Sequence, residues 1–153
     1  RKAKEGNIIP ITDPRMTRFS LNLQHGVDFV LECLESMEGG EKFVPKLPSF
    51  KVVELVKAVA PEAEIKIIGI RPGEKLHEKM VPEDESWHTL EFKDHYVIMP
   101  SFEWWDAEEF ATRHGGKFCQ DGFCYSSGNN DCWLDIPALK KTIEDFQAEG
   151  YVE

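Results

Sequence analysis

The chain has 153 residues, 41% of them hydrophobic, which is enough for one domain with a modest core. Its 28 acidic and 18 basic residues give a formal net charge of -10, which argues against nucleic acid or an anionic membrane as a partner. No apolar run approaches the roughly 20 residues of a membrane span, and the charged start lacks the apolar core of a signal peptide. Because the chain begins without Met and in mid-pattern, we interpret it as a cytoplasmic piece of a longer protein.

Four cysteines, Cys33, Cys119, Cys124 and Cys132, could in principle form two disulfides or one metal site. Their spacing after Cys119 matches no common zinc motif, and Cys33 falls on an apolar helical face. In the absence of a secretion signal, reduced thiols are the favoured interpretation, and no metal site is predicted.

The first part of the chain alternates predicted strands and helices. Residues 1–6 are predicted to be the charged end of a helix. Extended segments are predicted over residues 7–11 and 17–21, and a strand over residues 41–44. Asn22 is expected to cap a long amphipathic helix that runs to about Met37, and a second helix is expected over residues 52–60. The residues predicted to face inward are Val27, Val30, Leu31 and Leu34 in the first helix and Leu55, Val56 and Val59 in the second.

The rest of the chain continues the alternation. A short buried strand is predicted over residues 65–70, a helix over 74–80 and an acidic loop over 81–86. Residues 87–92 and 95–99 are predicted to form a hairpin or two edge strands. Two more helices are predicted over residues 106–113 and 135–149, the second capped by Asp135. The pattern indicates an α/β or α+β fold.

The segment Gly69–Glu78, with the sequence GIRPGEKLHE, joins the predicted strand to the predicted helix. Pro72 and Gly73 favour a tight turn there. Arg71 would then lie at a strand end beside free helix N–H groups, where an arginine can grip a phosphate bidentately. The alternative is that Arg71 pairs with Glu74 or Glu78 at the surface.

A second cluster, residues 10–19 with the sequence PITDPRMTRF, lies upstream. With the first, it resembles the C-terminal, substrate-binding part of nucleotide-sugar 4,6-dehydratases of the extended short-chain dehydrogenase/reductase type. The likeness is strongest to the inverting UDP-N-acetylglucosamine 4,6-dehydratase family. It covers nearly the whole chain through residues 11–19, 26–30, 39–46, 69–78 and 125–130.

The resemblance implies a site for the nucleotide diphosphate. It places Arg18, which follows Thr17 in a Thr-Arg segment, and Arg71 on the diphosphate, and it places Glu74 on the ribose hydroxyls. Thr17 is therefore grouped with the substrate-binding residues. Arg15 is either a third phosphate contact or a solvated charge, and the sequence leaves both open.

Other residues have a structural interpretation beside a functional one. His77 could be a general base, but an exposed or capping role is favoured. Trp104 and Trp105 could form a sugar platform, although burial is commoner. The loop at residues 125–130 is expected to hold the tail in place rather than to bind substrate.

Two motifs of the resembled enzymes are missing from the sequence. No Gly-x-x-Gly-x-x-Gly follows a strand, and none of Tyr96, Tyr125 and Tyr151 has a lysine four residues on. In that family the catalytic residues and the NADP site lie in a Rossmann half. Residues 1–153 are therefore expected to be a single substrate-binding subdomain that lacks the Rossmann half, holds no cofactor and is inactive alone.

The function that the resemblance implies is binding of UDP-N-acetylglucosamine for bacterial surface-sugar biosynthesis, in a pseudaminic acid or capsule pathway. A related nucleotide-sugar epimerase fragment and a non-catalytic binding module remain alternatives. The helices at residues 22–37 and 52–60 would normally pack partly on the missing half, so self-association, or binding of that half, is also predicted.

Overall fold

The computed structural model describes residues 8–148, and the chain divides into two compact units. The first unit comprises Arg1–Ser20, Pro48–Glu78 and Ser127–Glu153, and the second comprises Leu21–Leu47 and Lys79–Ser126. The helix predicted over residues 1–6 lies outside the described residues. The assignment of the whole chain to a single substrate-binding subdomain stays a prediction.

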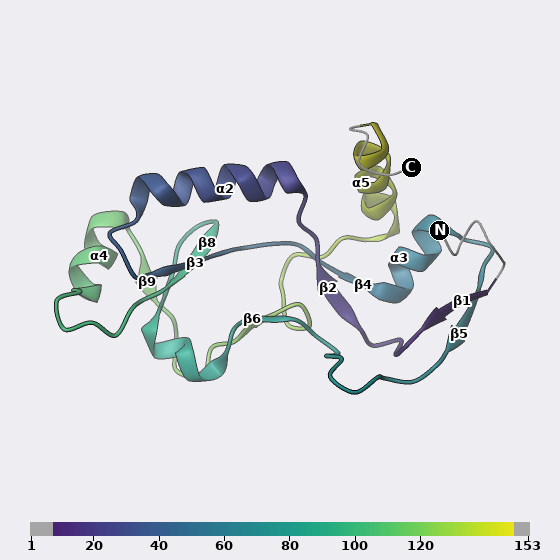
Figure 1. The fold of residues 1–153 in the computed structure, drawn as a ribbon, viewed down its shortest axis with the longest axis horizontal. Helices are drawn as coiled ribbons and strands as arrows, with labels where there is room; N and C mark the ends of the chain where they lie inside the picture. Colours follow the sequence, from purple (N-terminus) through teal and green to yellow (C-terminus); the bar gives the residue numbers. More distant parts are fainter. Residues whose placement is uncertain (1–7, 149–153) are drawn as a thin grey trace. The chain divides into compact units, whose positions relative to one another are not determined.

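Short paired strands form the sheets of the first unit. β1 (Ile8–Ile11) lies parallel to β5 (Glu64–Ile67), and β2 (Thr17–Phe19) pairs antiparallel with β4 (Ser49–Lys51), as Figure 1 shows. The predicted strand at residues 65–70 is thus shorter than expected and begins one residue earlier. It is also not buried, because Ile67 is 52% exposed and Ile68 is 45% exposed.

Two helices pack on each other in the first unit, namely α3 (Val52–Val59) and α5 (Ile136–Ala148). The start of α5 is fixed as predicted, since the carboxylate of Asp135 accepts a hydrogen bond of 2.9 Å from the backbone N–H of Ala138. Val56 of α3 and Leu139 of α5 are buried. Val59, predicted to face inward, is 52% exposed, and the buried residues of α3 are Val56 and Ala58.

The second unit is built on an antiparallel sheet with the strand order β3-β8-β7-β9. The strands are β3 (Lys42–Pro45), β8 (His95–Ile98), β7 (Thr89–Glu91) and β9 (Lys117–Phe118). The predicted hairpin is confirmed as β7 and β8. A 3₁₀ helix, η1 (Glu83–His88), replaces most of the expected acidic loop and the first residues of the expected strand.

The core of the second unit lies between this sheet and α4 (Ala107–His114). Asp106 caps α4 by accepting hydrogen bonds from the N–H groups of Glu108 and Glu109, and Gly115 ends it with φ 76°. The buried core residues are Leu90, Val97, Met99, Phe110 and Ala111. A further antiparallel pair joins β6 (Lys79–Val81) to β10 (Tyr125–Ser126).

The long helix α2 (Leu23–Ser36) forms as predicted, but its apolar face is not buried. Asn22 caps it, with its side-chain oxygen 2.6 Å from the backbone N of His25. Along Leu23–Ser36, every residue of which is described, none is buried. The predicted inward residues are 45–58% exposed, and they are Val27, Val30, Leu31 and Leu34. The helix instead turns Phe29 toward the sheet, where its ring lies 6.1 Å from the ring of His95.

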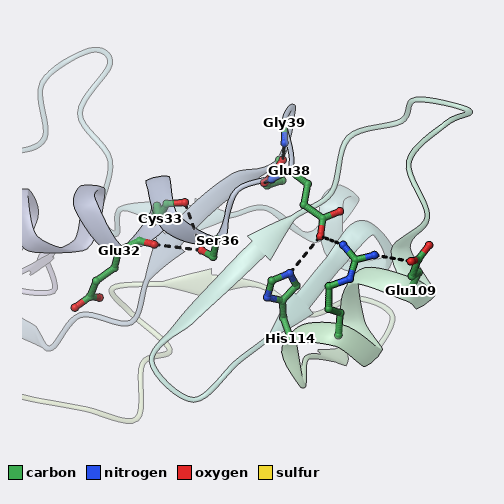
Figure 2. Close-up of polar contacts among 9 residues, drawn as sticks. Glu32, Cys33, Ser36, Glu38, Gly39, Glu109 and His114 are labelled. Atoms are coloured by element: carbon green, nitrogen blue, oxygen red, sulfur yellow. Dashed lines mark hydrogen bonds and ion pairs between the residues drawn. The ribbon is translucent and has the colours of Figure 1, made fainter.

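The end of α2 is fixed to α4 by charged side chains (Figure 2). The carboxylate of Glu38 accepts hydrogen bonds from Arg113 and from His114, the latter at 3.3 Å. Arg113 also pairs with Glu109 within α4. These contacts hold the C-terminal end of α2 while leaving its apolar face uncovered.

The cysteines are free thiols, and burial raises the pKa of Cys119 to about 11. Within residues 8–148, no group of three or more His, Cys, Asp or Glu side chains is arranged to hold a metal ion. None of the helices in this range has the length and apolar character needed to cross a lipid bilayer.

Candidate functional site

The carboxyl ends of β1 and β5 bring both predicted arginine segments to one edge. The parallel register places Ile11 opposite Ile67, and the pairing continues as the N–H of Ile68 donates to the carbonyl of Ile11 at 2.9 Å. The chain leaves β1 toward Arg15 and leaves β5 toward Arg71. The edge beyond the carboxyl ends of parallel strands is where open α/β sheets bind ligands.

Arg71 lies in an exposed loop beyond β5. Within residues 8–148 its guanidinium makes no hydrogen bond or ion pair, so the predicted alternative, a surface pair with Glu74 or Glu78, is not formed. The five N–H donors of this side chain are available to an anion.

Glu74 closes the turn that holds Arg71. Its carboxylate accepts a 3.0 Å hydrogen bond from the backbone N–H of Arg71, and its own N–H donates to the Arg71 carbonyl at 3.1 Å. Gly73 has φ 83°, a backbone conformation that favours glycine. The turn predicted at Pro72 and Gly73 is confirmed.

The prediction of a helix over residues 74–80 is wrong. Residues 74–78 form bends and irregular backbone, and β6 begins at Lys79. The reason is that backbone carbonyls of this stretch accept hydrogen bonds from segments distant in the sequence. The carbonyl of Leu76 accepts from the N–H of Thr17 at 3.0 Å, and the carbonyl of Glu78 accepts from the N–H of Ser127 at 2.8 Å. These tertiary bonds outweigh a weak local helix propensity.

Arg15 is occupied by Asp13. Its Nε and one terminal nitrogen lie 2.9 and 2.8 Å from the two Asp13 carboxylate oxygens, and its backbone N–H donates to the same carboxylate. These hydrogen bonds lower the pKa of Asp13 from 3.8 to about 2. Of the two interpretations left open by the sequence, an exposed and neutralised charge is the one that this geometry favours.

Arg18 is half-buried and bound mostly to backbone. One terminal nitrogen donates to the carbonyls of Thr17 at 2.6 Å and Leu76 at 3.2 Å, and its Nε lies 3.3 Å from a carboxylate oxygen of Glu78. The guanidinium therefore links β2 to residues 76–78. An anion would have to compete with the exposed Glu78 carboxylate for its remaining donors.

Thr17 does not face the solvent, since it is 3% exposed. Its hydroxyl lies 2.7 Å from Nδ1 of His77 and 2.7 Å from the hydroxyl of Ser127. Local sequence patterns could not indicate this cluster, because its members are separated by 60 and 110 residues along the chain. The expected structural role of residues 125–130 agrees with these contacts.

The two tryptophans differ in exposure. Trp104 is 69% exposed and stacks on Phe102, with ring centroids 5.3 Å apart. Trp105 instead packs on Phe110 of the core. Burial, the favoured interpretation of the pair, thus holds in part for Trp105, which is partly buried, and not for Trp104.

The chain is a mixed α/β protein in which the guanidinium of Arg71 is free beyond the parallel strands β1 and β5. Residues 1–100 match the model of a family described as polysaccharide biosynthesis protein. Because this match covers most of the chain, the chain belongs to that family.

Two of the curated relatives of this chain carry the same enzyme name. It is 47% identical over 147 residues to a UDP-N-acetylglucosamine 4,6-dehydratase (inverting) of Campylobacter jejuni serotype O:2. It is 51% identical over 147 residues to the protein of the same name from serotype O:23/36. Each alignment covers 94% of this chain and 43% of the relative, so the chain spans less than half of their length.

The fold is shared with a solved structure, Pen from Bacillus thuringiensis. The two superpose with a TM-score of 0.76 at 25% sequence identity, over 95% of this chain and 44% of Pen. The predicted mixed α/β fold is therefore confirmed, as is the resemblance to the inverting dehydratases.

Proposed function

We propose that this chain is the nucleotide-sugar-binding portion of an inverting UDP-N-acetylglucosamine 4,6-dehydratase that acts in the synthesis of a bacterial surface sugar. The observation that carries the proposal is the free Arg71 guanidinium, in a chain about half identical to two such dehydratases. The overall charge of -10 makes this local cation more notable, because a phosphate ligand needs positive charge nearby.

The diphosphate would bind beyond β5, at the turn that Glu74 closes. Arg71 would supply a bidentate contact and Arg18 a second, weaker one, since its guanidinium is shared with backbone carbonyls and Glu78. Glu74 would accept from the ribose hydroxyls. Thr17 supports the site from within rather than by touching the ligand, because it is buried.

The contribution of this chain to the reaction would be binding and orientation. Holding the nucleotide end of the substrate fixes where the sugar lies, which lowers the entropic part of the barrier. Bound NADP would supply the hydride chemistry in the whole enzyme. The sequence of this chain has no glycine-rich loop for that cofactor, so no reaction step is assigned to its residues.

Calorimetric titration of UDP into the 153-residue chain tests the proposal. Arg71→Ala removes a bidentate contact to a charged group, about 2–4 kcal/mol, so UDP affinity should fall about 30- to 1,000-fold. Arg71→Lys should recover only part of the loss, because an ammonium cannot reproduce the planar fork.

Arg15→Ala is the matched control at the same edge, since Asp13 occupies this arginine. It should change UDP affinity by less than about threefold. NADP, injected as a second control, should give no binding heat. A wild-type chain that does not bind UDP, or an Arg71→Ala variant that binds it as the wild type does, would contradict the proposal.

A further inference from the structure

His77 is held from one side of its ring only. Its Nδ1 lies 2.7 Å from the hydroxyl of Thr17, which is 3% exposed, while His77 itself is exposed. Within residues 8–148, Nε2 on the opposite edge of the ring makes no hydrogen bond or ion pair. One ring nitrogen is therefore fixed in the protein, and the other is available at the surface.

The backbone of Gly128 fixes the ring further. A Cβ atom at Gly128 would lie 2.6 Å from both Cγ and Nδ1 of His77, so only a glycine lets the ring take this place. The hydrogen bond and this close approach together restrict the rotamer of the side chain. A solvent-exposed histidine with no binding role would need neither the hydrogen bond nor the close approach of Gly128.

The hydrogen bonds behind the ring are compatible with an arrangement in which Nδ1 of His77 is an acceptor. The backbone N–H of Glu78, which can only donate, gives its hydrogen to the hydroxyl of Ser127 at 2.9 Å. The Ser127 hydroxyl can donate its hydrogen to the carbonyl of Thr17 at 3.1 Å or to the Thr17 hydroxyl at 2.7 Å, and in the second case Thr17 can donate to Nδ1 of His77 at 2.7 Å. In this arrangement Nδ1 accepts, so the neutral ring carries its proton on Nε2 and presents an N–H donor outward.

The donor belongs to the loop that carries Arg71. Both residues lie in the segment between β5 and β6, and Glu78, the next residue after His77, is paired with Arg18. The loop thus presents a free guanidinium and an oriented imidazole whose Nε2 edge faces outward. Fixed donors of this kind stabilise an anion without a further ordering cost.

We propose that His77 is a ligand of the phosphate groups of the nucleotide, donating from Nε2, and that Thr17, Ser127 and Gly128 are its positioning residues. This inference rests on the proposed function and adds to it a residue and a support for that residue. His77 contacts the ligand directly, while the other three act only through its ring.

Two substitutions separate the two edges of the ring. The amide of His77→Asn reaches the place of Nδ1 and keeps the contact to Thr17, but it removes the outward donor. Its affinity for UDP and for pyrophosphate should fall about tenfold, as for the loss of one hydrogen bond to a charged group, whereas any affinity for uridine should not change. The longer His77→Gln places its amide near Nε2 and should recover part of that loss.

Gly128→Ala supplies a test that does not alter His77. The added methyl group must displace the ring, so UDP affinity should fall as in His77→Asn. In the His77→Asn background, Gly128→Ala should have no further effect on affinity. A resonance of His77 Nε2 that shifts when UDP is added, measured by nitrogen-edited NMR of the wild type, would show the contact without any substitution.

The outcomes distinguish this inference from the proposed function. If Arg71→Ala weakens UDP binding and His77→Asn stays within about twofold of the wild type, the inference is overturned and the proposed function stands. If His77→Asn and His77→Gln lose affinity equally, and only in proportion to lost stability, the role of His77 is structural and the inference is again overturned. If the wild type binds neither UDP nor pyrophosphate, both are overturned.

Discussion

Two regions of the molecule depart from the usual rule that apolar side chains are buried and polar ones exposed. They are the polar cluster around Thr17 in the first unit and the apolar face of α2 in the second unit. In the cluster, the hydroxyls of Thr17 and Ser127 are buried and hydrogen-bonded. On α2, large side chains such as Val30 and Leu34 are more than half exposed. Buried polar groups are stable only when they are paired, and exposed apolar groups in one patch mark a surface that another surface can cover.

Local pattern and burial are therefore separate properties of a sequence. The apolar spacing on α2 predicts a helix, and the helix forms because its cap and its residues favour it locally. Whether that face is buried depends on what packs against it. The polar cluster has no local pattern, yet its members form a closely connected part of the first unit.

The greatest loss of stability is expected from substitutions in the core of the second unit. Phe110 is 2% exposed, and Phe110→Ala should lower the free energy of unfolding by about 3–5 kcal/mol. Val30→Ala, on the uncovered face of α2, should lower it by less than about 1 kcal/mol, because that side chain is 56% exposed. Urea denaturation of both variants measures the difference, and similar losses would mean that the α2 face is buried in the folded protein.

A smaller effect is expected on self-association through the apolar face of α2. If a second copy covers the α2 face, Val30→Asn should weaken association about tenfold or more, since a buried valine contributes about 1.5–3 kcal/mol. Glu35→Gln, an exposed position on the same helix, is the matched control and should change association little. Light scattering over a concentration series decides, and a wild type that stays monomeric at high concentration would contradict this prediction.

Much of the fold could be predicted because it is encoded locally. The caps at Asn22, Asp106 and Asp135 each lie next to the helix that they begin, and Gly115 lies next to the helix that it ends. The hairpin of β7 and β8 joins strands close in sequence. Short-range hydrogen bonding and backbone preference decide such features, so the sequence displays them.

The predictions that failed depend on contacts across long separations. The helix over residues 74–80 does not form because the carbonyls of Leu76 and Glu78 accept hydrogen bonds from the backbone N–H groups of Thr17 and Ser127. In the candidate site, the turn at Arg71 could be predicted from Pro72 and Gly73, whereas the pairing of Arg18 with Glu78 could not. Periodicity cannot identify a hydrogen bond that joins residues so far apart in the chain.

The smallest predicted effect is a pH dependence confined to the edge beyond β1. The hydrogen bonds from Arg15 lower the pKa of Asp13 from 3.8 to about 2 in the folded chain. Because the folded pKa lies below the unfolded one, the stabilising contribution is fully present above about pH 4 and is lost as the pH falls through about 2. The Asp13 carboxyl carbon, followed by NMR, should therefore titrate with a midpoint near 2.

Arg15→Gln supplies the control for this last prediction, because it removes the ion pair and leaves the carboxylate of Asp13 in place. The midpoint for Asp13 should then rise toward the value of a free aspartate, about 3.9. Val30 and Leu34 on the exposed apolar face of α2 have no titratable group. Their side-chain NMR signals should therefore not change over this pH range as long as the chain stays folded. An Asp13 midpoint near 4 in the wild type would show that Arg15 is not held by Asp13 in solution. Arg15 would then be free to contact a phosphate, the alternative that the sequence left open.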